Sequence, residues 1–457
     1  MVKKKEKPPR KARQKQPRPA KEKRPREKKA KRRGGAGKAS PVGLDLGRNY
    51  INAVQLKYLV GGAAMLSAAV DDLPDGLIQE GEVLDVDALS FAIRDFWKTN
   101  KIKGKKVALG LANQKVVVRT LEFPVLDEKE LRSAIEFQAQ DYIPIPIEEA
   151  ILDYHVLGRF KDENSIEKLK ILVVAAQKIM VMDFVNAIKK AKLAVSGIDL
   201  QAFAMLRSLA SKNVLELEPA SGAIALANIG SDVTNLVVEA GGEPQFTRII
   251  SFGADYFTRA VQDLKGITFK EAEVLKTRTG LGTPGERAPG EGEADTAIIP
   301  PTEGPQEFPA GEPGPSAPSE EPGEVKAAGE ERPGGEPPGP AKPEGPDITG
   351  TEAGGAAEVQ RVLELAAEAL ADEIRRSLDY YQTQEASAPV TRLLISGVGA
   401  QLPNLDRHLS QAFQFAVEIG DPLKRITQNR TGFSDEDLRS LGPRLAIAIG
   451  LALEDEE

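Results

Sequence analysis

Two short segments of the 457-residue chain carry a polar residue and a glycine directly after an apolar run. The first reads Val-Gly-Leu-Asp-Leu-Gly and ends at Gly47, and the second reads Ala-Leu-Ala-Asn-Ile-Gly and ends at Gly230. In each segment a second apolar run follows within a few residues, which predicts a β-hairpin. Free backbone N–H groups in such a turn can hold an anion. The repeat within one chain makes this interpretation more specific than either copy alone.

The residue two places before the glycine distinguishes the hairpins, because the first has Asp45 and the second has Asn228. A hairpin that grips a nucleotide phosphate for hydrolysis usually has a carboxylate at this position. A metal-bound phosphate site needs anionic oxygen ligands and a polarised water for in-line attack. Asn228 can donate or accept a hydrogen bond but has no charge. The second hairpin therefore predicts anion binding more readily than hydrolysis.

Composition excludes several other chemistries. The chain has no cysteine, which excludes disulfides, thiolate catalysis and cysteine-type metal sites. Its only histidines, His155 and His408, are far apart in sequence, so a histidine metal cluster is excluded within one chain. No apolar run reaches about 18 residues, so no membrane span is expected. The first 40 residues also lack the apolar core of a secretory signal.

Charge is distributed very unevenly along the chain. Residues 1–40 hold 19 Lys and Arg against three Glu, about +16, so the rest carries −7 − 16 = −23. We interpret this segment as a disordered basic arm, which either is simply solvated or binds anionic lipid, nucleic acid or an acidic partner. A second segment, 283–355, is dense in Gly, Pro and Glu and predicts a disordered acidic loop inserted at a surface turn.

The remaining segments predict ordinary α/β structure. Apolar runs ending at Gly47 and following Tyr50 predict strands, and a helix with Asp87 as its cap is expected over 85–100. Further helices are expected over 127–143, 179–192, 198–210, 271–280, 358–384, 402–413 and 442–453. The last has Pro443 near its start, and its small residues would allow a close helix crossing.

The two hairpins, a glycine-rich turn at Ser396–Ala400 and the final small-residue helix resemble the actin-like ATPase fold. In that fold two α/β lobes clasp a nucleotide, with one hairpin from each lobe over its phosphates. Within the fold the chain resembles the PilM family of type IV pilus assembly proteins from Val42 to Leu453, except for 283–355. The most specific matching run is IEFQAQDYIPIPIEEAILDYHVLG at 135–158, with further runs at 171–209, 266–276 and 393–413.

FtsA and the cytoplasmic part of GspL, from type II secretion, share this fold. FtsA ends in an amphipathic membrane helix and GspL carries a membrane span, and this sequence shows neither feature. After the arm at 1–40, the resemblance implies a first lobe at 41–114, an FtsA-like small subdomain inserted at 115–196, and a helix returning to the first lobe at 197–221. It further implies a second lobe at 222–282 and 356–442, split by the loop at 283–355, and an interdomain helix and tail at 443–457.

The resemblance also implies ATP or ADP with Mg²⁺ as cofactors. Asp45 would lie near the metal and the phosphates, and Gly47 would let the backbone approach them. Arg48 would either hold a phosphate bidentately or fill the site with its bulk. Glu273 and Lys276 match a pair that holds ribose and adenine, or else form a plain surface salt bridge. The remaining residues implied for the nucleotide site are Asn49, Asn228, Gly230, Ser231, Thr234, Gly397 and Gly399.

Two departures from the family pattern bear on catalysis. Asn228 replaces the usual Asp, and Arg48 replaces a small hydroxyl residue. The sequence therefore favours a nucleotide-binding scaffold with slow or absent turnover, and a site held together by packing alone is a further alternative. Rival functions are an active FtsA-like ATPase, a GspL-like secretion component and, more weakly, a sugar or acetate kinase, for which we find no general base.

The resemblance implies a cytoplasmic protein, peripheral to the inner membrane, that grips the N-terminal peptide of PilN, a single-span protein. A hydrophobic groove with an exposed strand edge would suit an extended peptide. Phe123, Phe137, Tyr142 and Ile143 are the expected peptide contacts, with plain core packing as the alternative for each. A pilus motor ATPase, a second copy of the chain and, through the basic arm, the anionic membrane surface are further expected partners.

Overall fold

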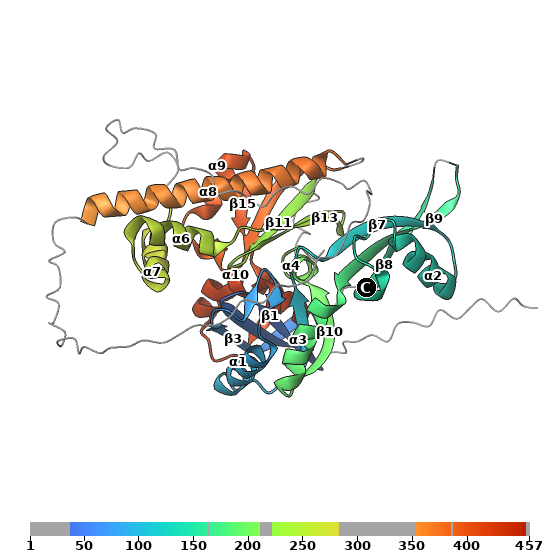
Figure 1. Ribbon diagram of the computed structural model, residues 1–457, viewed down its shortest axis with the longest axis horizontal. Helices are drawn as coiled ribbons and strands as arrows, with labels where there is room; N and C mark the ends of the chain where they lie inside the picture. The colour runs from blue at the N-terminus through green and yellow to red at the C-terminus, as the bar shows by residue number, and fades with distance from the viewer. Residues whose placement is uncertain (1–36, 163, 211–221, 283–351, 385–386, 454–457) are drawn as a thin grey trace, which may run out of the picture.

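The structure is a computed structural model that describes residues 37–162, 164–210, 222–282, 352–384 and 387–453 (Figure 1). Most of the predicted arm and acidic loop lies outside these ranges. The predicted C-terminal boundary of each segment was wrong. Strand β1 (Ala39–Leu46) begins within the predicted arm, and helix α8 (Glu352–Gln382) begins within the predicted loop. Ser40 is held in the sheet, since its Oγ accepts a hydrogen bond from the Leu56 amide at 2.9 Å.

The first lobe is built on a six-stranded sheet in the order β10-β6-β1-β2-β3-β16. Strands β1, β2 and β3 form an antiparallel meander. Strand β6 pairs with β1 in parallel, and β10 pairs with β6 in parallel. Apolar side chains on one face of the sheet pack with helices α1 and α3. The bounds are β2 (Tyr50–Leu59), β3 (Gly62–Asp72), β6 (Lys106–Leu111), β10 (Ala194–Leu200), β16 (Ile426–Asn429), α1 (Val86–Thr99) and α3 (Lys178–Lys190).

The second lobe is built on a five-stranded sheet in the order β13-β12-β11-β14-β15. The long helix α8 runs along one side of this lobe, with α6, α7 and α9 beside it (Figure 1), and these helices share a large apolar core with the sheet. The bounds are β11 (Ala223–Ile229), β12 (Thr234–Ala240), β13 (Glu243–Ile250), β14 (Val390–Ser396), β15 (Ala416–Ile419), α6 (Ala254–Lys265), α7 (Phe269–Thr279) and α9 (Leu405–Phe413).

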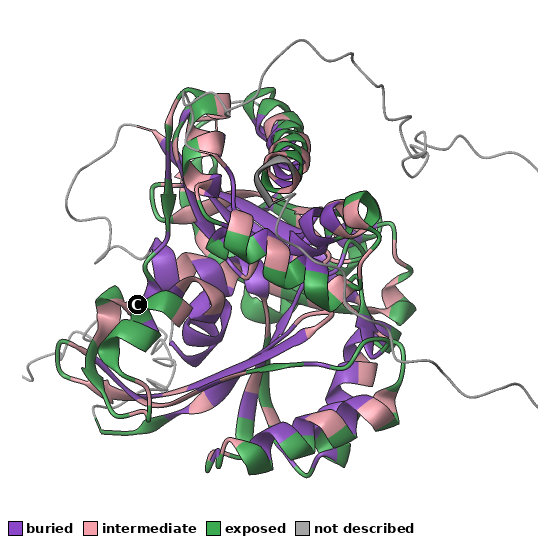
Figure 2. Cartoon of the chain, turned by 90° about the vertical axis from the view of Figure 1, so that its left-hand side faces the viewer, coloured by how far each residue is buried: buried purple, intermediate pink, exposed green. Residues whose placement is uncertain are grey.

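Two helices, α4 (Gln201–Leu209) and α10 (Asp435–Ala452), lie between the lobes (Figure 1). They contact each other and share apolar clusters with both sheets. A Cβ on Gly450 of α10 would fall 1.8 Å from the Ala204 carbonyl oxygen of α4, so only a glycine fits at this crossing. Buried residues, drawn in purple in Figure 2, lie on the sides of the sheets and helices that face each other.

A separate three-stranded sheet, here called the inserted sheet, has the order β7-β9-β8. Its strands are β7 (Val117–Pro124), β8 (Ala150–Lys161) and β9 (Glu167–Gln177), and α2 (Glu128–Ala139) covers one face. The inserted unit is shorter than the predicted 115–196, because α3 packs with α1 on the first lobe and β10 joins the first-lobe sheet.

Several predicted helix ends were wrong for local reasons. The cap of α1 is Asp85, whose carboxylate accepts the amides of Asp87 and Ala88. Helix α2 ends at Ala139 and not at the expected 143. The segment predicted as one helix from 198 first completes β10, since pairing with β6 continues to Leu200. Helix α10 begins well before Pro443, because Ser434 forms a capping box at its start.

Candidate functional site

The two predicted hairpins are present and are built alike. Asp45 pairs in register with Asn52 across β1 and β2, and Asn228 pairs with Asn235 across β11 and β12. Each turn is closed by its own glycine: the Gly47 amide donates to the Tyr50 carbonyl at 3.0 Å, and the Gly230 amide donates to the Val233 carbonyl at 2.9 Å. These two N–H groups are therefore already used within their turns.

Asp45 lies at the centre of a buried row of amides. Its Oδ2 accepts from Asn52 Nδ2 at 3.2 Å, and its Oδ1 accepts from Gln201 Nε2 at 2.9 Å. Gln201, the first residue of α4, accepts in turn from Asn235 Nδ2 of the second lobe at 2.9 Å. Burial raises the pKa of Asp45 to about 7, against the lowering effects of the Asn52 hydrogen bond and the Arg444 charge. The row links the two hairpins through α4.

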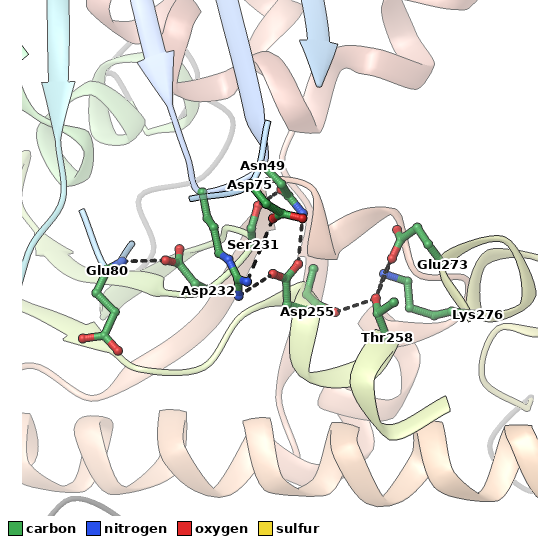
Figure 3. Close-up of polar contacts among 11 residues, drawn as sticks. Asn49, Asp75, Glu80, Ser231, Asp232, Asp255, Thr258, Glu273 and Lys276 are labelled. Atoms are coloured by element: carbon green, nitrogen blue, oxygen red, sulfur yellow. Dashed lines mark hydrogen bonds and ion pairs between the residues drawn. The ribbon is translucent and has the colours of Figure 1, made fainter. Parts of the chain in front are cut away.

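Closer to the surface, donors of the first lobe meet carboxylates of the second (Figure 3). Arg48 Nη1 lies 3.3 Å from Asp255 Oδ2, and Asn49 Nδ2 donates to Asp255 Oδ1 at 3.2 Å. The Ser231 hydroxyl donates to the Asn49 side-chain oxygen. We call these contacts, together with one between Glu80 and Asp232, the clasp. Its members are Arg48, Asn49, Glu80, Ser231, Asp232 and Asp255.

The last clasp contact joins a backbone amide to a carboxylate. The Glu80 N–H donates to Asp232 Oδ2 at 2.7 Å. Asp255 is the more enclosed of the two carboxylates, with 9% of its side chain exposed. Burial raises the pKa of Asp255 to about 6, against the lowering effect of the Arg48 charge. The clasp thus places two anionic groups of one lobe against donors of the other.

Tyr50 covers Gly47 and comes close to Gly230. A Cβ on Gly47 would lie 2.2 Å from the Tyr50 ring, and a Cβ on Gly230 would lie 3.7 Å from its hydroxyl oxygen. The residue is buried, and the Arg444 guanidinium lies 5.9 Å from the centre of the ring. The aromatic ring therefore covers Gly47, and its hydroxyl group reaches the neighbourhood of Gly230.

The predicted adenosine turn packs directly on the second hairpin. Gly397 has φ +89°, and a Cβ there would fall 2.4 Å from the Ile229 carbonyl oxygen. A Cβ on Gly399 would fall 2.2 Å from the Ile229 side chain. Asn228 Oδ1 accepts from Ser396 Oγ at 3.2 Å, whereas Asn228 Nδ2, alone among buried side-chain polar atoms of the described residues, has no partner. Packing within the lobe is sufficient to require both glycines.

The other predicted nucleotide residues are satisfied by the protein itself. Lys276 Nζ donates to Glu273 Oε2 at 2.7 Å and to the Thr258 hydroxyl at 2.9 Å. Lys276 is only 6% exposed, so the pair is more than the surface salt bridge considered as the alternative. The Thr234 hydroxyl is fully buried and donates to the Phe252 carbonyl at 2.7 Å.

The space between the hairpins tests whether a nucleotide fits. The cavity bordered by Gly47, Tyr50, Gly230 and Ser231 has a volume of about 20 Å³, which is room for about one water. Pockets for small molecules usually measure hundreds of Å³. The unpartnered Asn228 amide would suit an anion, but with the clasp closed the phosphates of ATP or ADP do not fit. The described residues also contain no group of three or more acidic or histidine side chains placed to hold a metal.

Sequence reasoning missed four residues that shape this site: Gln201, Asp232, Asn235 and Asp255. Gln201 begins α4, and Asp255 lies in the first turn of α6. They are 156 residues from Asp45 and 206 residues from Asn49, so no spacing pattern connects these pairs. Asp232 and Asn235 follow Gly230 in the second hairpin, beside the predicted site residues Ser231 and Thr234, and this position in the same turn was an available signal.

Of the four predicted peptide contacts, two are enclosed and two are exposed. Phe123 and Ile143 are 2% and 6% exposed in the core of the inserted sheet, so for them the core alternative holds. Phe137 and Tyr142, at and just after the end of α2, are 77% and 48% exposed. No helix of the described residues is long and apolar enough to cross a bilayer.

Comparisons with known proteins place this geometry in context. A family model for type IV pilus assembly protein PilM matches residues 43–287 and 355–456. Among solved structures, a PilM–PilN type IV pilus biogenesis complex is similar at a TM-score of 0.66 and 21% identity, over 90% of this chain and 97% of that one. This likeness bears out the predicted actin-like ATPase fold.

Two further structures are similar at lower scores. Ethanolamine utilization protein EutJ from Carboxydothermus hydrogenoformans has a TM-score of 0.44 and 12% identity, over 91% of this chain and 89% of that one. MreB5 of Spiroplasma citri bound to ADP has a TM-score of 0.40 and 13% identity, over 91% of this chain and 95% of that one.

Proposed function

Because the chain belongs to the PilM family of type IV pilus assembly proteins, we propose that it is a scaffold of a pilus machine that captures the N-terminal peptide of a PilN-like membrane protein. The observation that carries the proposal is the extent of the likeness to a PilM–PilN complex, which spans 97% of that chain. This likeness shows the fold, and peptide binding by this chain is the proposal that we add to it.

The inserted sheet and its surroundings offer features that suit an extended peptide. Among the residues that the structure describes, strands β8 and β10 each pair on one side only, which leaves an edge for an added strand. Ile151 of β8 and Ile198 of β10 are about two-fifths exposed at these strands. Phe137 and Tyr142 add exposed aromatic surface, which is the kind of side chain enriched at binding hot spots.

Peptide binding tests this proposal directly. A fluorescent peptide copying the N-terminal segment of the cognate PilN-like protein should bind the full chain, measured by anisotropy. Phe137→Ala and Tyr142→Ala should each weaken binding about tenfold, the loss expected for a hot-spot residue. Phe91→Ala is the matched control, because Phe91 is 62% exposed on α1 of the first lobe. A peptide that does not bind, or binds all three variants equally, contradicts the proposal.

We also propose that ATP or ADP with Mg²⁺ is at most a weakly held ligand and that turnover is slow or absent. The uncharged Asn228 and the closed clasp support this view. Turnover at the usual enzyme scale of about 1–10³ per second in a phosphate-release assay would favour the active ATPase instead. A pilus motor ATPase, a second copy of the chain and the anionic inner face of the membrane remain proposed partners, as does a cytoplasmic location beside that membrane.

A further inference from the structure

The clasp resembles an anion-binding site in which carboxylates of the protein itself act as the anion. Its first-lobe side provides the Arg48 guanidinium, the Asn49 amide and the Glu80 backbone N–H. These are the donor types that bind phosphate oxygens in proteins. In the second lobe their acceptors are the carboxylates of Asp232 and Asp255 (Figure 3). Arg48 also lies 4.0 Å from the exposed carboxylate of Asp75 in its own lobe. The two carboxylates of the second lobe thus occupy donors of the kind that phosphate groups use.

Other contacts reinforce this arrangement. The Ser231 hydroxyl, expected to face a phosphate, donates to Asn49 of the opposite hairpin. Tyr50 covers Gly47 and comes close to Gly230, and the amides of both glycines close their own turns. With every one of these groups engaged, the space left between the hairpins is about 20 Å³.

We propose that the clasp is an autoinhibitory contact, in which Asp232 and Asp255 act as built-in substitutes for the phosphates of a polyphosphate ligand and must be displaced before such a ligand can enter. The contact joins the two lobes through the protein's own side chains, between the hairpins that the resemblance assigns to nucleotide binding. It concerns the space between the lobes and does not depend on peptide capture, although it takes the actin-like site as the place where a polyphosphate would bind.

Charge removal on the carboxylate side tests the inference. The Asp232→Asn/Asp255→Asn double variant should bind inorganic tripolyphosphate at least tenfold more tightly than wild type, measured by titration calorimetry. Adding Arg48→Ser should abolish this gain, because the freed guanidinium is then missing. The matched control is Asp71→Asn/Asp72→Asn, which removes two exposed carboxylates at the end of β3, in register with Ile51 and Tyr50.

Each outcome decides the matter. An equal gain in the control variant would mean that only the general negative potential matters, and a gain that survives Arg48→Ser would mean that Arg48 is not the donor. No gain in the double variant, or tight binding by wild type, would also overturn the inference. If the double variant does not fold, the single Asp255→Asn variant carries the same test with a smaller expected gain. Peptide binding, measured in parallel, should be equal in all variants, so failure here is distinguishable from failure of the proposed scaffold role.

Discussion

The ring of Tyr50 lies so close to Gly47 that a Cβ on the glycine would fall 2.2 Å from ring carbon Cε1. Gly47 does not have a positive φ. The contact with the ring, and not the backbone conformation, therefore requires a glycine at this position. This relationship reverses the expected reason for the glycine, which was the approach of a phosphate. In this protein the glycine accommodates an aromatic ring of its own hairpin.

Gly47→Ala should therefore be destabilising in wild type, by about 1–3 kcal/mol as for other overpacked sites. In a Tyr50→Val background, where the ring is absent, the same substitution should cost less than about 0.5 kcal/mol. Urea unfolding of the four proteins in a double-mutant cycle measures the difference. Equal costs in the two backgrounds would show that the ring is not the reason for Gly47.

Asp255 gives stability a defined pH dependence. Its pKa rises from 3.8 in the unfolded chain to about 6 in the fold, so the folded state binds more protons between pH 4 and pH 6. This contribution to stability is present at low pH and is lost as pH rises through about 6. The shift corresponds to about 3 kcal/mol at 1.36 kcal/mol per pKa unit, as an upper bound.

Asp255→Asn should therefore gain stability relative to wild type as pH rises from 4 to 7. The comparison is made by urea midpoints at several pH values, in which every other titrating group is shared by the two proteins. A stability difference that stays constant with pH would contradict the raised pKa.

Gly397→Ala should destabilise the second lobe strongly, by about 3 kcal/mol or more, because two penalties coincide. The backbone is at φ +89°, and the added Cβ would meet the Ile229 carbonyl oxygen at 2.4 Å, where no flexible side chain can yield. Gly158→Ala in β8 is the control, since it has ordinary φ and no atom within 4 Å of its Cβ position. That change should lie within about 1 kcal/mol of neutral. Similar melting temperatures for both variants would contradict the prediction.

The basic arm should bind anionic membranes. A net charge of about +16 over residues 1–40 would gain about 1 kcal/mol per Lys or Arg close to an anionic surface, within a Debye length of about 10 Å at 0.1 M salt. The full chain should sediment with anionic liposomes at low salt, and a shortened chain beginning at Gly37 should not. Duplex DNA as competitor distinguishes a lipid preference from general polyanion binding, and a wide preference for DNA would count against the membrane role.

Much of the fold followed from local patterns, because apolar periodicity marks strands and helices wherever a short segment decides its own structure. The two hairpins and the small residues of the final helix are examples. The ends of several elements were set by contacts that the periodicity does not show. Strand β10 continues to Leu200 because it pairs with β6, and helix α10 begins before Pro443 because Ser434 caps it. The site residues depended even more on contacts between distant segments. Asp45 of the first lobe and Asn235 of the second are connected through Gln201, the first residue of α4. A single sequence contains no spacing that predicts such contacts.

The tight crossing of α4 and α10 also bears on how the two lobes could move. Gly450 lies against the Ala204 backbone, so the two helices are in close contact at the crossing, and rotation about this point is a motion that would keep the contact. The crossing is near the middle of the molecule, whereas α8 extends along the far side of the second lobe (Figure 1). A rotation about the crossing that separated the clasp by a small distance would therefore move the distant end of this helix through a larger arc.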